Sequence, residues 1–135
     1  MAVFVDTGIF VALNNSVDNH HSRARELFKQ ALNGDFGAIF TSDYIINEAV
    51  TTALVRTKRK DLAIDLGKYI IESPRITKIW VTAEAFNQTW KNFRALKDKL
   101  LSFTDCNSLA LMEARGIKQI MSFDQGFDGL VERIH

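Results

Sequence analysis

Four acidic residues carry the chemistry that this sequence suggests. Asp6 directly follows a short apolar run near the start of the chain, and Asp124 ends another apolar run near its end. Asp105 lies in the first turn of a predicted helix, and Glu48 lies in the second turn of another. Two carboxylates about 5 Å apart repel each other by roughly 3 kcal/mol at an effective dielectric constant near 20. If the four side chains meet at one place, a cation is needed to offset that repulsion.

The cation that suits these side chains is Mg²⁺ or Mn²⁺, because hard divalent ions take oxygen ligands. The sequence has no His beside the acids and no Cys pair, which argues against zinc. His20 and His21 are interpreted as exposed polar residues, and Cys106 as a small buried residue.

Each acid also has a purely structural explanation. Asp105 can stabilise the start of its helix, Asp6 can cap the short helix that follows it, and Asp124 can begin a turn. Glu48 has the weakest such explanation, because it lies beside the apolar stripe of its helix. All four explanations would have to hold independently at one place, so we favour a metal site.

Alternating strands and helices must position these residues. Crossover helices of ten or more residues between strands predict an α/β domain of three layers, α/β/α, with a parallel sheet of four to five strands. In such sheets the ligand crevice lies beyond the carboxyl ends of the strands, where the four acids are expected. The expected strands are 2–5, 37–41, 76–81, 117–123 and, at an edge, 131–134.

Helix starts and stops are predicted from capping residues and apolar periodicity. The expected helices are a short buried one over 8–13, one capped by Asp18 or Asn19 and stopped by Gly34, one capped by Ser42 or Asp43, one over 61–73 ended by Pro74, one capped by Thr82, and one capped by Thr104 and stopped by Gly116. The helix after Thr82 carries an apolar stripe at helical spacing, which includes Trp90 and Phe93 and is interpreted as core; its alternative role is to bind a partner.

Composition describes an ordinary globular chain. The 135 residues, 47% hydrophobic and 24% charged, predict a single domain over 1–135. One cysteine fits a reducing compartment, no apolar run is long enough to cross a membrane, and no signal peptide is recognised, so we expect a cytoplasmic location. Dinucleotide, P-loop and hydrolase-elbow motifs are absent.

The net charge of +1 conceals an uneven distribution. Without the four acids, 12 acidic residues remain against 17 basic ones, a surplus of +5. Clusters of basic residues are typical of solvated surfaces, but they also bind RNA phosphates. The cluster interpreted as a weak RNA-binding candidate consists of Arg56, Lys58, Arg59 and Lys60.

At four places the sequence resembles the PIN domain family, and within it the VapC-like toxin ribonucleases of toxin–antitoxin pairs. The matching segments, in chain order, are Val5-Asp6-Thr7, Ser42 through Glu48, Phe103-Thr104-Asp105 and Ser122-Phe123-Asp124. The resemblance covers nearly the whole chain. It implies a Mg²⁺- or Mn²⁺-dependent endoribonuclease whose catalytic acids are Asp6, Glu48, Asp105 and Asp124.

By the same resemblance, Asp6 and Asp105 are the most direct metal ligands, and Glu48 and Asp124 act directly or through water. The metal set is thus Asp6, Asp105 and Asp124. The residues expected to orient them are Thr7, Thr104, Ser122 and Asp128.

Three positions depart from the family pattern: Gly8, Cys106 and Gly126. Gly126 stands where the family often has another acid, and Asp128 is the residue that can replace it. These departures affect the expected binding of a second metal ion more than that of the first.

The resemblance also implies partners: an RNA substrate, a cognate antitoxin that places a basic residue in the acidic site, and a second copy of the chain in a homodimer. Two alternatives keep the same fold, namely a catalytically silent PIN module for binding or assembly and an RNA-processing nuclease without an antitoxin. A receiver-type signalling domain ranks below both, because Asp6 has no acidic neighbour and Asp124 stands where a receiver needs Lys.

Overall fold

Five parallel strands form the sheet in a computed structural model that describes all residues from 1 to 135. The strands are β1 (Ala2–Val5), β2 (Ala38–Ser42), β3 (Ile76–Ile79), β4 (Gln119–Met121) and β5 (Glu132–Ile134), in the order β3-β2-β1-β4-β5. The predicted parallel α/β sheet is therefore confirmed, including the edge position of the last strand. Two of the strands are shorter than expected: β3 ends before Val81, and β4 covers only three residues.

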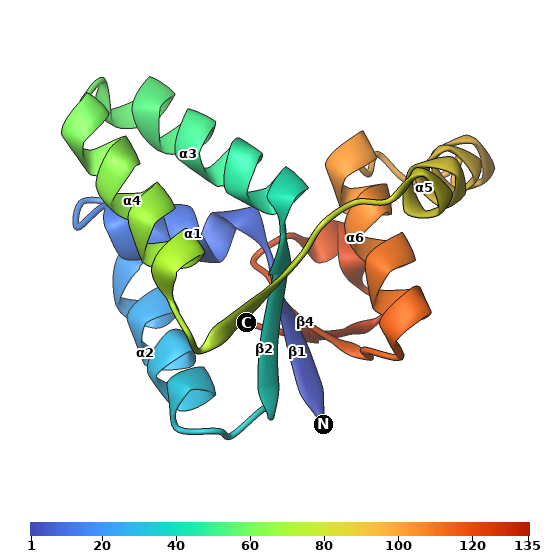
Figure 1. Ribbon diagram of the computed structural model, residues 1–135, viewed down its shortest axis with the longest axis horizontal. Coiled ribbons are helices and arrows are strands. Elements are labelled where there is room, and N and C mark those ends of the chain that lie inside the picture. The colour runs from blue at the N-terminus through green and yellow to red at the C-terminus, as the bar shows by residue number, and fades with distance from the viewer.

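Helices cover both faces of the sheet, which confirms the three-layer architecture (Figure 1). The layer on one face is made of α1 (Thr7–Asn14), α2 (His21–Leu32), α3 (Asp43–Thr57) and α4 (Lys60–Glu72), and the layer on the other face of α5 (Ala83–Ala95) and α6 (Phe103–Arg115). None of the helices combines the length and apolar character needed to cross a membrane.

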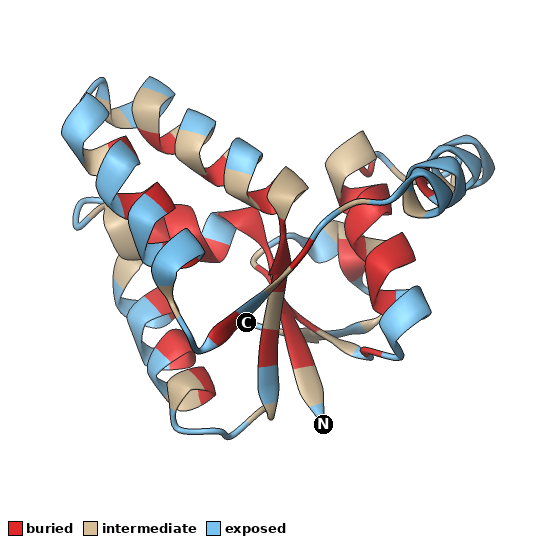
Figure 2. Cartoon of the chain, in the orientation of Figure 1, coloured by how far each residue is buried: buried red, intermediate tan, exposed pale blue.

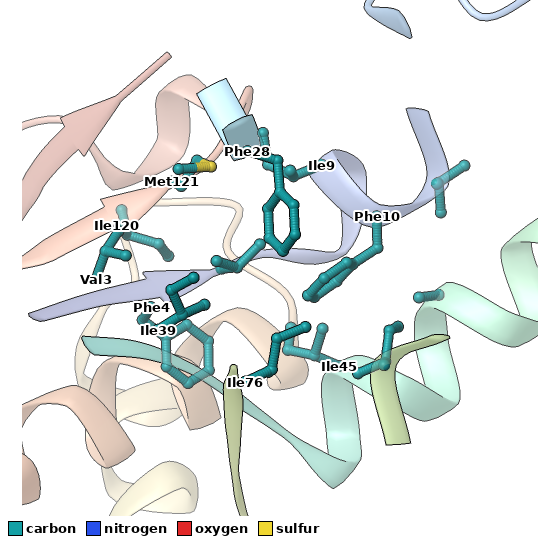
Figure 3. Close-up of a cluster of buried hydrophobic side chains, with 14 of the residues drawn as sticks. Val3, Phe4, Ile9, Phe10, Phe28, Ile39, Ile45, Ile76, Ile120 and Met121 are labelled. Carbon is teal, nitrogen blue, oxygen red and sulfur yellow. The ribbon is translucent and has the colours of Figure 1, made fainter. Parts of the chain in front are cut away.

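The core lies between the sheet and both helical layers. The central strand β1 is buried on both faces, as a continuous apolar run predicts, and Val3, Phe4 and Val5 are fully inaccessible (Figures 2 and 3). Isoleucines from the neighbouring strands, Ile39 and Ile120, extend the same cluster. The end of β1 is therefore a rigid platform for the residue that follows it.

The start of α6 differs from the prediction in a way that affects the site. Ser102, not Thr104, is the capping residue: its hydroxyl accepts a hydrogen bond from the backbone N–H of Asp105 at 3.0 Å, and the Asp105 carboxylate accepts one from the N–H of Ser102 at 2.9 Å. This reciprocal pair satisfies two backbone donors that would otherwise lack partners. The helix consequently begins at Phe103, and Asp105 is its third residue.

The start of α2 is also different. Neither Asp18 nor Asn19 occupies the capping position; the helix begins at His21, after His20. The Asp18 carboxylate instead accepts a hydrogen bond from the backbone N–H of His20 at 2.8 Å, which forms a local turn before the helix. The predicted caps at Ser42 and Thr82 and the stop at Gly116, which has φ = +67°, are confirmed.

The apolar stripe of α5 was interpreted from the sequence as part of the core, and this interpretation is wrong. Phe86, Trp90 and Phe93 are 43–48% exposed, and the only buried residue of the helix is Thr89, which accepts a hydrogen bond from Asn107 of α6 at 3.0 Å. The helix packs on α6 at the margin of the domain, so it has no second layer to cover its rings. Instead Phe86 and Phe93 contact Phe103, with ring centroids 5.5 and 5.9 Å apart.

The corrected cap of α6 makes a testable prediction. Ser102→Ala should lower the free energy of unfolding by about 1 kcal/mol, because one cap hydrogen bond is lost. Thr104→Ala is the matched control: its hydroxyl makes no hydrogen bond within the chain, so little change is expected. Urea denaturation of the two variants tests this, and a larger loss for Thr104→Ala would contradict the assignment.

Candidate active site

Asp6 stands at the centre of the site, directly after the central strand. Its backbone N–H bonds to the carbonyl of Met121 at 3.0 Å, which ties the ends of β1 and β4 together. Asp6 occupies the capping position of α1, yet its side chain makes no capping hydrogen bond. The structural explanation of Asp6 as a helix cap is therefore wrong. Its carboxylate instead accepts a hydrogen bond from the hydroxyl of Ser122 at 2.6 Å.

Burial makes the charged form of Asp6 unfavourable. The residue is only 6% exposed, and desolvation raises the pKa of its carboxyl from 3.8 to about 6. Hydrogen bonds from Ser122 and from the backbone of Thr7 oppose this rise, while the charges of Asp105 and Glu48 add to it. Asp6 is thus a buried acid whose neighbours include two more acids.

Asp105 approaches the same place from the start of α6. It is 9% exposed, and burial raises the pKa of its carboxyl despite the two hydrogen bonds that it shares with Ser102. The charges of Asp124 and Glu48 raise it further. One carboxylate oxygen serves the capping pair, and the other makes no hydrogen bond within the chain. Asp105 therefore both caps the start of α6 and belongs to the acidic cluster.

Glu48 and Asp124 complete the cluster at more accessible positions. Glu48 is half-buried on α3, and Asp124 is exposed after β4. The Asp124 carboxylate accepts a hydrogen bond from the N–H of Gly126 at 2.8 Å, so the predicted turn is present as well. Asp105 lies close enough to Asp6, Glu48 and Asp124 for their charges to interact, and the charge of Glu48 also acts on Asp6. None of them forms an ion pair within the chain.

The hydroxyl of Ser122 connects two of these acids. It donates to Asp6 and accepts a hydrogen bond from the backbone N–H of Asp124 at 3.0 Å. Of the other three residues expected to orient the acids, Thr7 is buried with a hydroxyl that has no hydrogen-bond partner, and Thr104 makes no side-chain hydrogen bond. Of the four residues expected to orient the acids, only Ser122 therefore donates a hydrogen bond to a carboxylate of the cluster.

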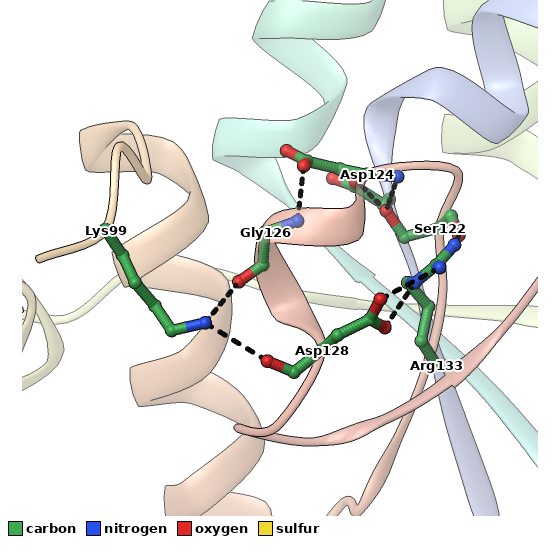
Figure 4. A network of polar contacts seen from close by, with 7 residues as sticks. Lys99, Ser122, Asp124, Gly126, Asp128 and Arg133 are labelled. Carbon is green, nitrogen blue, oxygen red and sulfur yellow. Dashed lines mark hydrogen bonds and ion pairs between the residues drawn. The ribbon is translucent and has the colours of Figure 1, made fainter.

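Asp128 does not join the acidic cluster. Its carboxylate is bound by the guanidinium of Arg133 at 2.7 and 3.1 Å, and this partner lowers the pKa of Asp128 (Figure 4). The idea that Asp128 replaces a missing acid at Gly126 is therefore not supported. Gly126 itself has no room for a side chain, since a Cβ would lie 2.9 Å from Leu101 and 3.0 Å from the Asp124 carboxylate.

The donor set suits a hard divalent cation with few direct protein ligands. No three acidic, His or Cys side chains are arranged to ligate one ion together. Mg²⁺ commonly takes only one or two carboxylates and completes its shell with water and substrate phosphate. Asp6 and Asp105 are the two buried carboxylates of the cluster, which matches the small number of protein ligands that such an ion takes.

The predicted RNA-binding cluster lies away from these acids, at the junction of α3 and α4. Arg56 is eight residues beyond Glu48, about 12 Å further along the same helix. Arg56 and Arg59 are paired with Asp18 and Asp61, respectively. The exposed Lys58 and Lys60 form no ion pair.

Sequence reasoning missed two residues that support the site. Ser102 could have been found from its spacing, because a Ser three residues before an acid is the pattern of a reciprocal cap. Arg133 gave no local signal, because its role depends on the pairing of β5 with β4. A third contact, the stacking of His20 on Phe123 with ring centroids 4.3 Å apart, places a histidine beside the segment that carries Asp124.

Residues 3–132 match the family model of the PIN domain. The chain is 29% identical over 132 residues to the 23S rRNA-specific endonuclease VapC20 of Mycobacterium tuberculosis, with 96% of each chain covered. It is also 29% identical over 131 residues to a VapC ribonuclease of Archaeoglobus fulgidus, covering 94% of this chain and 80% of the relative.

Two solved structures are similar to this one. The crystal structure of Mycobacterium tuberculosis VapC20, described as a sarcin–ricin loop cleaving toxin, superposes with a TM-score of 0.85 over 96% of this chain and 97% of the other. VapBC2 from Rickettsia felis, solved bound to a promoter DNA fragment, gives a TM-score of 0.70 at 14% identity, over 99% and 98% of the chains. The second likeness concerns the fold alone.

The raised pKa of Asp6 predicts how pH affects the stability of the metal-free protein. A folded-state pKa near 6 against 3.8 means that the charged carboxylate costs about 3 kcal/mol at neutral pH. The contribution of protonated Asp6 to the free energy of unfolding is therefore fully present below about pH 4, and it is lost as the pH rises through about 6. Asp6→Asn should therefore stabilise the metal-free protein by up to about 3 kcal/mol at pH 7.5 and far less at pH 4.

Urea denaturation in the presence of a chelator, at both pH values, measures this difference. Asp35→Asn is the control, since Asp35 is exposed and its side chain makes no hydrogen bond. An Asp6→Asn protein that loses stability equally at both pH values would contradict the assignment.

Proposed function

Because the chain belongs to the PIN domain family, we propose that it is a Mg²⁺- or Mn²⁺-dependent endoribonuclease that hydrolyses RNA phosphodiester bonds and acts as the toxin of a type II toxin–antitoxin pair. The observation that carries this proposal is the gathering of four carboxylates at one edge of the sheet without an ion pair to neutralise them. The names of the relatives, which are ribonucleases, support the reaction class.

In the proposed reaction, Asp6 and Asp105 would hold the ion, and Glu48 and Asp124 would act on it directly or through water. When bound, the ion would lower the pKa of water for attack and offset charge on the phosphate. Ser122 fixes the orientation of the Asp6 carboxylate through its 2.6 Å hydrogen bond. Burial of Asp6 and Asp105 keeps competing solvent away from their charged oxygens, which strengthens their attraction for a cation.

The alternative functions differ in how well they fit the fold and the acidic cluster. A receiver-type domain requires the strand order 2-1-3-4-5 of that fold, whereas this sheet has the order 3-2-1-4-5. A catalytically silent PIN module has no need to keep four unpaired acids together at an energetic cost. A nuclease that processes RNA without an antitoxin uses the same site, and only the presence of a dedicated protein partner separates it from a toxin.

The antitoxin of the proposed pair would cover an apolar surface and direct a basic residue into the acidic cluster. A hollow of about 610 Å³ between α2 and α4 offers such a surface. Its apolar lining consists of Leu13, Phe28, Leu32 and Tyr69. The remaining lining residues are Ser22, Arg25, Glu26 and Lys29. This mixture of apolar and charged side chains suits an amphipathic segment of a partner, which buries its apolar face and pairs its polar one.

RNA contacts beyond the cut bond are assigned to the basic cluster at the junction of α3 and α4. Within it, Lys58 and Lys60 are exposed and unpaired, whereas Arg56 and Arg59 already have acidic partners. The two lysines are therefore the residues that phosphates would engage first, in binding that weakens as salt increases.

A homodimer would bury the aromatic surface of α5, formed by Phe86, Trp90 and Phe93. Each aromatic side chain presents roughly 150–250 Å², and the three are 43–48% exposed, so roughly 300 Å² is available from these rings alone. Contiguous apolar patches of this size commonly mark an interface between proteins.

Cleavage should depend on the two buried acids. Asp6→Asn and Asp105→Asn should each reduce Mg²⁺-dependent cleavage of RNA at least about a hundredfold, since losing a charged ligand removes the attraction for the ion. Both variants should fold, because an amide oxygen can accept the hydrogen bonds from Ser122 and from the N–H of Ser102. Cleavage is measured by gel electrophoresis of labelled RNA, with Asp35→Asn as the control.

Two outcomes would contradict the proposed function. One is full cleavage by both variants, which would leave the acids with a structural role only. The other is a wild-type protein whose melting temperature does not respond to millimolar Mg²⁺ or Mn²⁺, because a ligand at 100 times its Kd should stabilise the folded state by about 2.7 kcal/mol.

The oligomeric state can be tested at α5. Trp90→Glu should convert a dimer into a monomer, because a charge in the middle of a buried apolar interface is strongly unfavourable. Ile64→Glu on α4 is the control, since Ile64 is equally exposed but lies on a different helix. Light scattering coupled to size-exclusion chromatography measures the mass, and a monomeric wild-type protein would rule out the homodimer.

A further inference from the structure

One segment after β4 carries both the hydroxyl that orients Asp6 and the exposed acid Asp124. Ser122 opens this segment, and its hydroxyl bonds to both acids. The segment has little regular structure of its own: one short 3₁₀ turn, Gln125–Phe127. Because its position sets the distance between Asp124 and Asp6, whatever holds the segment also shapes the acidic site.

The guanidinium of Arg133 holds the segment near both of its ends. Its Nη1 donates to the carbonyl of Ser122 at 3.2 Å, while Nε and Nη2 donate to the Asp128 carboxylate at 2.7 and 3.1 Å (Figure 4). Arg133 lies on β5, whose pairing with β4 brings it beside the segment. The Arg133 side chain is only 7% exposed and its contact with Ser122 is partly buried, whereas the Asp128 carboxylate lies at the surface.

Lys99 adds a second tie from the loop between α5 and α6. Its Nζ donates to the carbonyls of Gly126 and Asp128 at 3.3 and 3.1 Å (Figure 4). The segment is thus held from two sides. Of these two side chains only Arg133 reaches Ser122, whose backbone N–H also donates to the carbonyl of Ile134 at 3.0 Å.

The pairing of Arg133 with Asp128 also has an electrostatic consequence. The charge of Asp124 acts on Arg133, so the two groups are near each other. An unpaired guanidinium at this place would attract the Asp124 carboxylate and compete with a metal ion for it. Asp128 neutralises the guanidinium and so leaves the negative charge of the cluster available.

We propose that Arg133 is a positioning residue of the carboxylate site, and that Asp128 is the counter-charge that lets Arg133 act through hydrogen bonds without neutralising the acids. This inference rests on the proposed function in that the site holds a divalent cation. A lysine could not replace Arg133, because the three donors that reach Ser122 and Asp128 belong to one planar group.

Mn²⁺ binding to the full-length protein, measured by isothermal titration calorimetry, tests the proposal without relying on activity. Arg133→Gln should raise the Kd for Mn²⁺ about tenfold or more, in the range found when residues that orient metal ligands are removed. Arg133→Lys should also bind more weakly than wild type, and Asp128→Asn should weaken binding while keeping the hydrogen bond to Ser122. The Mg²⁺ concentration for half-maximal cleavage should shift in parallel.

Arg75→Gln is the matched control, because Arg75 is an exposed arginine that donates to a backbone carbonyl, that of Leu32, away from the acids. A change in melting temperature alone, with Mn²⁺ affinity like that of Arg75→Gln, would overturn the proposal and leave Arg133 a structural residue. Where Arg133→Gln fails to fold, Arg133→Lys and Asp128→Asn decide, and unchanged affinity in both overturns it.

The two proposals fail in different ways. A wild-type protein that binds Mn²⁺ but cleaves no RNA contradicts the ribonuclease proposal, and the comparison of Kd values still decides the role of Arg133. A wild-type protein that binds no Mn²⁺ contradicts both.

Discussion

The burial of Asp6 is the constraint on which the site depends. A carboxylate that is 6% exposed and surrounded by further acids is unstable in its charged form, as the rise of its pKa to about 6 expresses. Two contacts counter this: a short hydrogen bond from Ser122 and one from the backbone at Thr7. Neither supplies positive charge. The fold therefore keeps an unfavourable negative charge at Asp6, which a bound cation would offset in the proposed function.

The topology explains how four distant parts of the sequence reach one place. β1 is central, so Asp6 lies between the residues that follow β2 and β4. The chain crosses to the other face of the sheet after β3, and α6 then returns to bring Asp105 to the same edge. Val3, Phe4 and Val5, which precede Asp6, are fully buried, and this fixes the position of Asp6 more firmly than that of the other acids. Glu48 and Asp124 are more accessible, so in the proposed site they would be free to adapt to an ion and its water ligands.

The sequence predicted the sheet and the acidic cluster because both leave local signals. Apolar runs mark strands, and acids directly after such runs meet at one edge of a parallel sheet. The sequence did not predict the exposure of Phe86, Trp90 and Phe93, because helical periodicity gives the direction of a stripe but not whether anything covers it. Nor did it predict the role of Arg133, because an edge strand expected over 131–134 does not show which groups of the preceding connection its arginine will bond. Asp128 was misassigned as the replacement for an acid at Gly126 for the same reason, since its pairing with Arg133 depends on how the chain turns between β4 and β5.

The placement of basic residues leaves the four acids without a positively charged partner within the chain. The chain has 17 Lys and Arg residues, yet none forms an ion pair with the four acids. The guanidinium of Arg133, whose charge interacts with that of Asp124, is already paired with the Asp128 carboxylate. An intramolecular ion pair in the site would relieve the repulsion permanently and abolish the need for metal. A basic side chain from another protein would relieve it reversibly, in competition with the ion. In the proposed function, the same unneutralised charge that would attract a metal ion would also open the site to inhibition by a partner, so one electrostatic feature accounts for both halves of the toxin–antitoxin proposal.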